Sequence, residues 1–325
     1  MRTLLDSAGT DRPERRTALV ARELARYNAD IVALSETRFA EIGQLTEVGG
    51  GYTFFWSGRS SKVRRESGVG FAVKTHLVKK LSSLPQGVND RLMTLQLQLR
   101  GDKQATLISA YAPTMTNPEE VKDKFYEELE SLIDKVPKKD KLIILGDFNA
   151  RVGTDHQTWE GVIGRHGVGK CNSNGLLLLR LCTVHDLSIT NTLFRQPNRN
   201  KTTWMHPRSK HWHLLDYVIT RRADRRDFQV TKSMCGAACW TDHRLVISKA
   251  NLRILPKRRP QGKETTKRLD VSKLKCSETK EEFIRGLDSR LNSIASVHGD
   301  VEEAWKELRD VVYSTAAEHL GHTYY

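Results

Sequence analysis

The stretch Leu142-Ile-Ile-Leu-Gly-Asp-Phe-Asn-Ala-Arg151 decides the fold of this sequence. Four apolar residues and a glycine run directly into Asp147, Phe148 and Asn149. A short apolar run of this kind predicts a buried strand. Because residues two apart on a strand point the same way, we expect Asp147 and Asn149 to share one face and Phe148 to point into the core. Asp and Asn also favour turns, so a loop that begins at Asn149 is the alternative.

Other apolar runs in the chain also have polar side chains at one end. The pairs of run and polar residue are Ile31–Leu34 with Glu36, Leu107–Ala110 with Tyr111, Leu214–Leu215 with Asp216, and Leu245–Ile247 with Asp242 and His243. Taken singly, each residue has a plain structural explanation: a solvated loop acid, a half-buried tyrosine, a surface imidazole or a core acid with a partner. Their recurrence at the ends of predicted strands favours a polar site built on a rigid support.

The remaining patterns alternate between strands and helices, which predicts an α/β fold. Predicted helices cover 12–27, 117–136 and 175–184, and predicted strands cover 30–34, 68–73, 92–99, 105–111 and 187–191. At the second helix we expect Asn117 as the N-cap, Pro118 at the first helical position and Glu120 completing a capping box.

The segments 202–205 and 211–220 predict a hairpin. Its aromatic and histidine side chains are expected to face DNA or solvent, where rings and cations can meet bases and phosphates. These side chains are Trp204, Trp212, His206, His211 and His213. After about residue 252 the composition changes to a basic linker and a helical tail. We therefore expect one α/β domain over residues 1–252 and an appendage over residues 253–325.

The chain carries a formal charge of +14 over 325 residues. A charge of this size favours a polyanionic partner, with nucleic acid ahead of an acidic membrane surface. No apolar run approaches the ~20 residues that span a bilayer, so we expect no membrane segment. The five cysteines are an odd number, which favours a reducing compartment over a disulfide framework. We therefore expect a nuclear or cytoplasmic protein whose partner is a nucleic acid.

Several short segments, taken together and in order, carry a resemblance to a known family. They are LSETR (34–38), SAYAP (109–113), LGDFNAR (145–151), LLDYVIT (214–220) and WTDHRLV (240–246). The set resembles the endonuclease/exonuclease/phosphatase superfamily, which includes AP endonucleases and DNase I-like enzymes. Residues 202–220 look closer still to endonuclease domains of non-LTR retrotransposons and their host-encoded, craniofacial development protein 2-like group. The resemblance implies a four-layer α/β sandwich of two packed sheets flanked by helices, with a helical appendage.

The resemblance also implies a role for each polar residue. Glu36 would hold a Mg²⁺ ion, or Mn²⁺, since such hard ions favour carboxylate oxygens. Asp242 would help to bind that metal or to fix His243. Asp147 would orient or deprotonate the attacking water, and Asn149 would hydrogen-bond the scissile phosphate.

Two further roles follow from the same resemblance. His243, oriented through its ring N–H by Asp216, would donate to a phosphoryl oxygen and stabilise the developing charge. Tyr111 would hydrogen-bond the phosphate or the leaving oxygen. The implied reaction is in-line attack of water on a DNA phosphodiester, helped by the metal as a Lewis acid.

The family's first strand lies just ahead of the stretch that corresponds to Arg2–Leu5, and it usually ends in an Asn that contacts metal or phosphate. The sequence opens at Met1, so we expect an N-terminally truncated form of the fold. Two alternatives to an active DNA endonuclease stay open. One is a catalytically impaired remnant that binds nucleic acid or a protein partner, and the other is a phosphoinositide or sphingolipid phosphatase of the same fold.

Overall fold

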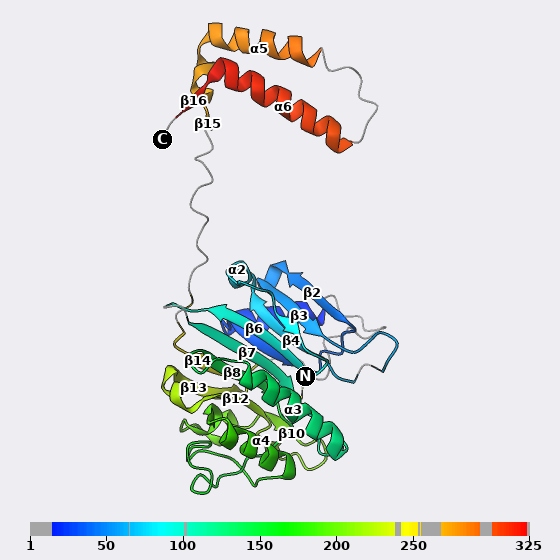
Figure 1. Cartoon of the computed structure of the whole chain (residues 1–325), viewed down its shortest axis with the longest axis vertical. Coiled ribbons are helices and arrows are strands. Elements are labelled where there is room, and N and C mark those ends of the chain that lie inside the picture. Colours follow the sequence, from blue (N-terminus) through cyan, green and yellow to red (C-terminus); the bar gives the residue numbers. More distant parts are fainter. Residues whose placement is uncertain are drawn as a thin grey trace. The chain divides into compact units, whose positions relative to one another are not determined.

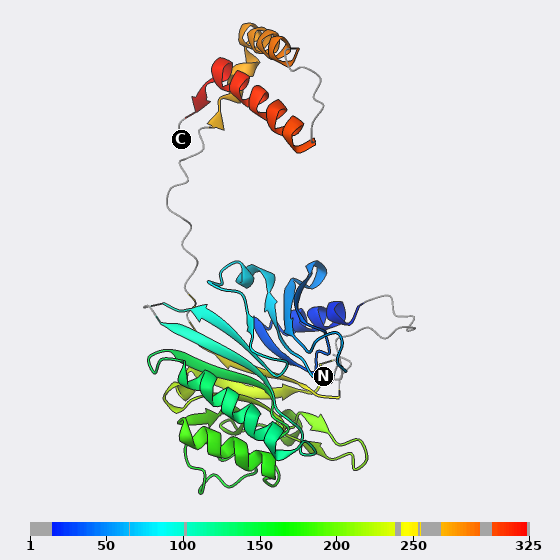
Figure 2. The same ribbon diagram turned by 45° about the vertical axis from the view of Figure 1, so that its right-hand side comes forward.

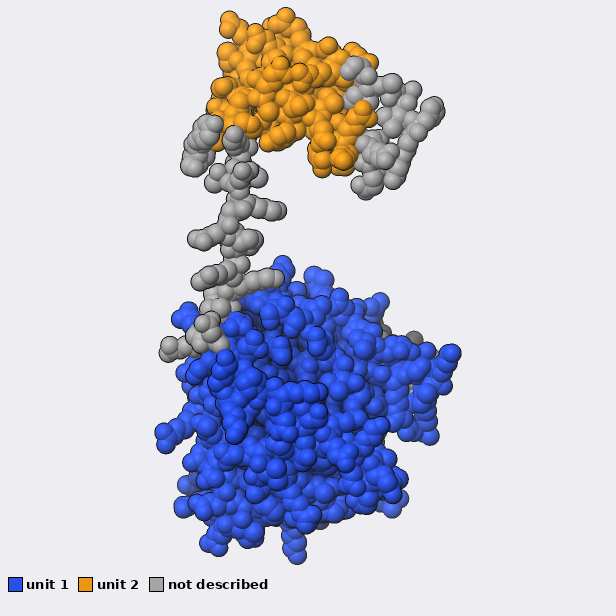
Figure 3. All heavy atoms as spheres, viewed as in Figure 1, with its two compact units in different colours: residues 1–257 blue, residues 258–325 orange. Residues whose placement is uncertain are grey.

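The structure is a computed structural model that describes residues 15–64, 66–100, 103–237, 242–252, 254, 268–292 and 301–323. The chain divides into two compact units, residues 1–257 and residues 258–325, drawn in blue and orange in Figure 3. Unit 1 contains every polar residue that the sequence assigns to the candidate site.

A four-stranded antiparallel sheet forms one layer of unit 1 (Figure 1). Its strand order is β1-β4-β3-β2, which places β1 at one edge. The strands are β1 (Ile31–Ser35), β2 (Ile42–Glu47), β3 (Tyr52–Ser57) and β4 (Val69–Lys74). Central strands β3 and β4 are rich in aromatic and β-branched residues because both of their faces are covered.

A six-stranded sheet with the order β5-β6-β7-β8-β12-β9 forms the next layer. Only the pair β7 and β8 is parallel, and the long helix α3 makes the crossover between them. The strands are β5 (Gln86–Gly87), β6 (Leu92–Gln98), β7 (Gln104–Tyr111), β8 (Lys141–Asp147), β9 (Leu187–Ile189) and β12 (Asp216–Arg221). A separate two-stranded sheet consists of β13 (Phe228–Met234) and β14 (Leu245–Ala250).

Helices cover the outer faces of the two large sheets, which makes four layers (Figures 1 and 2). The helix α1 packs on the four-stranded sheet, and α3 and α4 pack on the six-stranded sheet. The helices of unit 1 are α1 (Arg16–Arg26), α2 (Thr75–Val78), α3 (Glu119–Asp134) and α4 (Ser173–Val184), with the 3-10 helices η1 (Val48–Gly50), η2 (Thr190–Thr192), η3 (Asn198–Asn200) and η4 (Arg222–Asp227). This is the four-layer α/β sandwich that the family resemblance implied.

Three apolar cores separate the four layers. The core under α1 includes Leu24 and Phe54. The central core between the two sheets includes Leu107, and the core under α3 includes Phe125 and Ile144. Full burial of a side chain of this size contributes roughly 1.5–3 kcal/mol, so these cores hold the layers in register.

The strand β6 has the alternation that its sequence predicted. Met93, Leu95 and Leu97 are buried in the central core, whereas Gln96 is exposed. The period of two is therefore a reliable guide here, because only one face of β6 meets the other sheet.

The start of α3 differs from the prediction. Pro118 is the N-cap residue, the helix begins at Glu119, and no side chain caps it. The Asn117 side-chain oxygen instead accepts hydrogen bonds from the backbone N and the hydroxyl of Thr114, at 2.8 and 2.9 Å. The predicted cap is wrong because Asn can satisfy a preceding turn as well as a helix end.

The predicted hairpin is shorter than expected. The strand β10 (Trp204–Met205) pairs with β11 (Trp212–His213), and β12 lies in the six-stranded sheet instead. Between them Leu214 and Leu215 are both buried, and the carbonyl O of Leu215 accepts a hydrogen bond from the backbone N of Phe148 at 3.0 Å. Because Leu214 and Leu215 are both buried, the chain leaves the hairpin at these residues and enters the large sheet as β12.

The described residues of unit 2 form two helices that pack together, a 3-10 helix and a small two-stranded sheet. These elements are α5 (Ser277–Leu291), α6 (Val301–Leu320), η5 (Val271–Lys275), β15 (Arg268–Leu269) and β16 (His322–Thr323). The basic stretch 255–260 lies outside the described residues. Within the described part of the chain, no helix combines the length and the apolar character that a membrane span requires.

Candidate active site

Three neighbouring strands of the six-stranded sheet meet one rim of unit 1. Tyr111 is the last residue of β7, Asp147 is the last residue of β8, and Asp216 is the first residue of β12. The register places Asp147 directly beside Tyr111 on one side and beside Asp216 on the other. The sheet therefore brings three of the predicted site residues to adjacent positions on rigid strands.

Gly146 lets β8 approach β7 closely just before the rim. It has a φ of 153°, and a Cβ atom at this position would lie 1.8 Å from the carbonyl O of Ala110. Only glycine fits such an approach. The glycine that interrupts the apolar run thus sets the position of Asp147.

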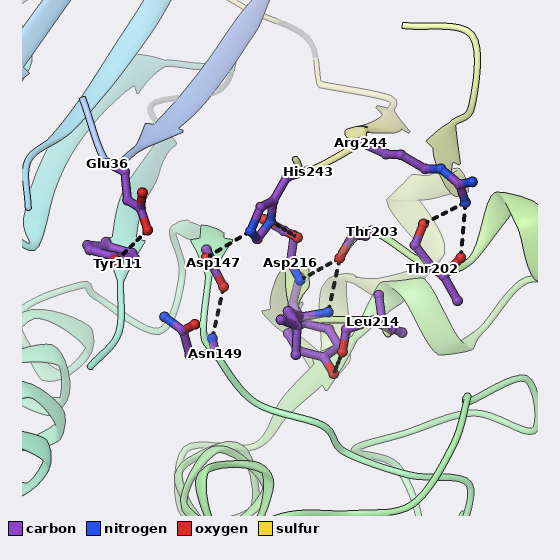
Figure 4. Close-up of polar contacts among 12 residues, drawn as sticks. Glu36, Tyr111, Asp147, Asn149, Thr202, Thr203, Leu214, Asp216, His243 and Arg244 are labelled. Carbon is purple, nitrogen blue, oxygen red and sulfur yellow. Dashed lines mark hydrogen bonds and ion pairs between the residues drawn. The ribbon is translucent and has the colours of Figure 1, made fainter. Parts of the chain in front are cut away.

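His243 joins the two aspartates. Its Nδ1 lies 2.9 Å from Oδ2 of Asp216, and its Nε2 lies 3.8 Å from Oδ2 of Asp147 (Figure 4). The side chains of His243 and Asp147 are 13% and 3% exposed, so water screens these contacts little. Among the described residues, the three side chains form a group that could hold a metal ion, with ligand atoms within 4.8 Å of one another.

Burial and charge move the pKa values of all three groups. Burial raises the pKa of Asp147 to about 7, and the charge of Asp216 adds to this effect. Burial opposes protonation of His243, but the charges of both aspartates and the hydrogen bond to Asp216 outweigh it and raise its pKa to about 9. Burial likewise opposes ionisation of Asp216, yet the imidazolium and its hydrogen bond hold the pKa of Asp216 below the usual range. Between about pH 7 and pH 9, the protonated His243 therefore lies between two ionised carboxylates.

Glu36 and Tyr111 form a second polar pair at the rim (Figure 4). The Tyr111 hydroxyl donates to Oε1 of Glu36 at 2.7 Å, and the other carboxylate oxygen lies 3.6 Å from Nη2 of Arg38. Burial, with the charge of Glu36, raises the pKa of Tyr111, so the phenol stays a hydrogen-bond donor. Glu36 follows β1 with a φ of 54°, a conformation that is uncommon for a non-glycine residue and often found at functional sites. The pair connects the two sheets.

Asn149 does not continue the strand, and the expectation that it shares a strand face with Asp147 is wrong. Asn149 has a φ of 47°, and its backbone N donates to Oδ1 of Asp147 at 2.9 Å. Its side-chain amide donates to the carbonyl O of Ala112, also at 2.9 Å. The aspartate thus forms an Asx-type turn at the strand end, which was the alternative reading of this stretch. Phe148 is fully buried, as predicted.

Asp242 lies next to His243 along the chain but is exposed. Its carboxylate is not part of the group formed by Asp147, Asp216 and His243. The carboxylate of Glu36 is outside that group as well. The assignment of Glu36 and Asp242 to metal binding stays a prediction.

Sequence reasoning missed residues that hold the site in place. Thr203 is fully buried, and its hydroxyl accepts hydrogen bonds from the backbone N of Leu215 at 3.0 Å and of Asp216 at 3.3 Å (Figure 4). Asn174, at the start of α4, donates from its side chain to the carbonyl O of Asn149 at 3.1 Å. No local pattern marks either residue, because both contacts join segments that are distant along the chain.

The hairpin begins directly beside His243. Trp204 forms an isolated β-bridge with His243, and their ring centroids are 6.3 Å apart. The Arg244 guanidinium lies 3.4 Å from the ring centroid of Trp212 and donates to the carbonyl O of Arg199 at 2.8 Å. A cation stacked on a partly exposed indole is a surface suited to nucleic acid bases and phosphates.

The donor set at the rim fits a hard divalent cation. Asp147 and Asp216 supply carboxylate oxygens within the group of three, and Mg²⁺ and Mn²⁺ favour such oxygens. The charges of Asp216 and Asp147 raise the pKa of His243 to about 9, so the imidazole is protonated at neutral pH, which favours a hydrogen-bond donor over a metal ligand, since a histidine ligand must be neutral.

The chain matches the model of the Endonuclease/Exonuclease/phosphatase family over residues 5–243. It is 36% identical over 244 residues to Craniofacial development protein 2 of Bos taurus, and 35% identical over 244 residues to the protein of the same name from Tragulus javanicus. These matches cover 74% of the chain but 39% and 41% of the two relatives. The chain therefore spans about two fifths of the length of the curated relatives it matches. The resemblance stated from the motifs is confirmed.

Solved structures of similar fold include DNA-processing enzymes. The APE2 catalytic domain of Xenopus laevis has a TM-score of 0.54 at 18% identity, with 75% of this chain and 91% of that chain covered. The endonuclease domain of the telomere-specific non-LTR retrotransposon TRAS1 has a TM-score of 0.52 at 18% identity, with 73% and 93% covered. At these identities the likeness is one of fold, and it confirms the DNase I-like architecture.

Proposed function

Because the chain belongs to the endonuclease/exonuclease/phosphatase family, we propose that it is a divalent-cation-dependent endonuclease that hydrolyses DNA phosphodiester bonds. One observation carries this proposal: Asp216, His243 and Asp147 form a continuous polar row at the rim that also holds the pair Glu36 and Tyr111. Phosphodiester hydrolysis needs a group that takes a proton from water and groups that stabilise charge on the phosphate. The rim holds both kinds.

Asp147 is the proposed general base. Its pKa of about 7 is close to that of an effective base at neutral pH, because burial makes the carboxylate a stronger proton acceptor. The turn that begins at Asp147 brings Asn149 to the same rim, where its carboxamide is proposed to contact the scissile phosphate.

His243 is the proposed donor to the phosphate. Its pKa of about 9 keeps the imidazole protonated at neutral pH, and Asp216 fixes the ring through Nδ1. A positively charged hydrogen-bond donor that is already oriented does not have to reorganise when negative charge develops on the phosphate in the transition state. Tyr111 also stays protonated, and it is proposed to donate a hydrogen bond to the phosphate or to the leaving oxygen.

Glu36 is the proposed ligand of the cation, with Asp242 in a supporting role at the His243 side. When bound, Mg²⁺ or Mn²⁺ would act as a Lewis acid on a phosphate oxygen. The hydrogen bond from Tyr111 orients the carboxylate of Glu36 for this task.

DNA is the proposed substrate. The charge of +14 favours a polyanion. The APE2 and TRAS1 domains share the fold, and a 3′ phosphatase from Neisseria of the same fold was solved with a product DNA hairpin. Arg244 stacked on Trp212 provides a basic and aromatic surface beside the site.

A nicking assay on supercoiled plasmid tests the proposal. We expect the full chain to nick the plasmid with Mg²⁺ and to stop when the cation is chelated. Asp147→Ala and His243→Ala should each lower the rate by at least about 10²-fold, the contribution of a positioned proton-transfer group. His185→Ala is the matched control. His185 also faces a carboxylate, with Nδ1 3.4 Å from Oδ1 of Asp134, but it precedes β9 at the opposite end of β12 from Asp216.

Loss of activity in the control variant, or equal nicking by wild type and both site variants, would contradict the assigned roles. A wild type that leaves the plasmid uncut yet binds DNA would identify the chain as a nucleic-acid-binding relative without catalysis. Hydrolysis of a lipid headgroup phosphate without nicking would assign the rim to phosphatase chemistry.

A further inference from the structure

The end of the six-stranded sheet opposite the candidate active site is bordered by three loops. They adjoin the start of β7, the start of β8 and the end of β12, and these three strands are neighbours in the sheet (Figure 1). Asp147 ends β8 at the candidate active site, whereas Lys141 begins it at the opposite end. The seven residues of β8 therefore separate the loops from the site by roughly 20 Å.

Contacts between the loops join them into one surface. Nη2 of Arg221 donates to the carbonyl O of Val136 at 2.7 Å, which ties the end of β12 to the turn before β8. Asp140 in that turn is buried, and its Oδ1 accepts a hydrogen bond from the backbone N of Gln104 at 3.0 Å. Because Gln104 begins β7, the three loops are held side by side.

Acidic side chains in and beside these loops are engaged by basic neighbours. Nζ of Lys141 lies 2.6 Å from Oδ1 of Asp224 and 2.6 Å from Oδ2 of Asp227, both in η4. Oδ1 of Asp186, just before β9, lies 3.8 Å from Nη1 of Arg222. These pairs neutralise most of the negative charge at this end of the sheet.

The other basic side chains of the loops are exposed, and no acidic side chain of the described residues lies within ion-pair distance of them. We call these six residues the basic patch: Arg100, Lys103, Lys138, Lys139, Arg225 and Arg226. Soluble surfaces ordinarily mix charges of both signs. The segregation of positive charge at this end of the sheet therefore indicates a polyanionic partner.

The composition of the basic patch favours the phosphates of a nucleic acid duplex. Among the described residues of the three loops, no large apolar or aromatic side chain is exposed. Attachment to a membrane surface or to a protein partner relies on such side chains as well as on charge. Binding of single strands relies on aromatic rings that stack on bases. Lysine and arginine without aromatic residues are typical of contacts to a duplex backbone.

We propose that the basic patch binds the phosphate backbone of a second nucleic acid duplex, while the active-site rim binds the first. The patch and the rim lie at opposite ends of the same strands, so one chain can hold both duplexes at once. Contacts to phosphates carry no sequence information, so the second duplex is bound without base specificity. This inference goes beyond the proposed nuclease activity and does not require catalysis.

A bridging assay with the full chain tests the inference. The parent chain carries Asp147→Ala, so that Mg²⁺ can be present while cleavage is slowed. One DNA duplex is fixed to beads, and a second, fluorescent duplex of DNA or of RNA is added in solution. We expect the chain to retain the fluorescent duplex on the beads, and we expect retention to fall steeply as salt rises. Retention of either kind of duplex supports the inference and identifies what the patch binds.

Charge reversal locates the second binding site. The patch variant adds four substitutions to the parent chain: Lys138→Glu, Lys139→Glu, Arg225→Glu and Arg226→Glu. Loss of these phosphate contacts should lower retention of the fluorescent duplex by at least about tenfold. Should the patch variant not fold, as judged by its Tm, glutamine at the same four positions should cause a smaller loss in the same direction.

The control variant makes the same change of net charge in unit 2. Its four substitutions are at exposed residues of η5, α5 and α6: Lys275→Glu, Lys280→Glu, Arg285→Glu and Lys306→Glu. The control variant should retain the fluorescent duplex as the parent chain does, because its basic patch is intact.

Three outcomes would overturn the inference. The first is a parent chain that retains no fluorescent duplex. The second is equal retention by the patch variant and the control variant, which would assign bridging to the total charge or to association of two chains. The third is binding to vesicles of phosphatidylcholine and phosphatidylserine that the patch variant loses, without retention of a duplex, which would assign the patch to a membrane surface.

Discussion

The imidazole of His243, held between Asp147 and Asp216, sets the charge of the rim. Folding raises its pKa from about 6.5 to about 9, so protonation of His243 contributes stability that is fully present below about pH 6.5 and is lost as the pH rises through about 9. The raised pKa of Asp147 has the same sign: ionisation of this buried carboxyl lowers stability as the pH rises through about 7. The pKa of each of these two residues depends on the protonation state of the other.

Removal of the Asp216 charge should shift the pH dependence of catalysis. In the wild type we expect a bell-shaped profile of kcat/KM, with limbs near pH 7 for Asp147 and pH 9 for His243. Asp216→Asn should move both limbs to lower pH, since the Asp216 carboxylate raises both pKa values. Nicking rates between about pH 5 and 10 give the profile. An alkaline limb unchanged from wild type would exclude His243 as its source, and Asp134→Asn, at the partner of His185, serves as the control.

Gly146 is the residue at which a single methyl group should be most disruptive near the rim. Gly146→Ala forces a Cβ atom against the carbonyl O of Ala110 and should lower the free energy of unfolding by about 1–3 kcal/mol or more. Urea denaturation measures the change. Gly49→Ala, where a Cβ meets no atom within 4 Å, should stay within about 0.5 kcal/mol of wild type. Equal stability of the two variants would contradict the close approach of β7 and β8.

At the scale of elements, the site depends on how β12 and the hairpin divide the segment 204–221. The short strands β10 and β11 stay outside the large sheet, while β12 enters it beside β8. Thr203 binds the backbone at this division and fixes Asp216 opposite Asp147. One continuous sequence pattern thus yields both the hairpin that is proposed to bind DNA and the strand that carries Asp216.

The hairpin should contribute to DNA affinity through its exposed indole. Trp212→Ala removes the ring that stacks on Arg244 and should weaken binding by about 1–3 kcal/mol, the usual contribution of an aromatic stacking surface. Fluorescence anisotropy of a labelled oligonucleotide measures the affinity. Trp305→Ala is the matched control, since Trp305 is 62% exposed in α6 of unit 2. A larger loss in the control than in Trp212→Ala would place the DNA surface elsewhere.

At the scale of the whole molecule, the two packed sheets bring together residues that are distant along the sequence of unit 1. Glu36 follows β1 of the small sheet, and Asp147 ends β8 of the large one. Tyr111 joins them through its hydrogen bond to Glu36 and its pairing with Asp147. The central core between the sheets therefore determines the distance across the site.

The charge of the whole chain should dominate DNA binding. A protein of net charge +14 that contacts six to ten phosphates loses about 10³–10⁵-fold in affinity between roughly 50 and 200 mM salt. Anisotropy titrations over this range, at constant Mg²⁺, give the slope. An affinity that does not change with salt would mean that phosphate contacts do not drive binding.

Local periodicity was enough to predict the regular elements and the fold class. The alternation in β6 and the apolar run of β8 each identify a strand, because burial on one or two faces leaves its own period in the sequence. The order of the short motifs was enough to indicate the family. These properties depend on neighbours within a few residues, or on spacing along the chain.

The tertiary structure alone decided how those residues meet. Asn149 leaves the strand through a turn, β12 leaves the hairpin for the sheet, and Thr203 supports Asp216 from a distant segment. The raised pKa of Asp147 also arises only after the sheets pack. Burial, charge pairing and strand partners depend on residues far apart along the chain, and the free energies of these contacts exist only in the packed fold.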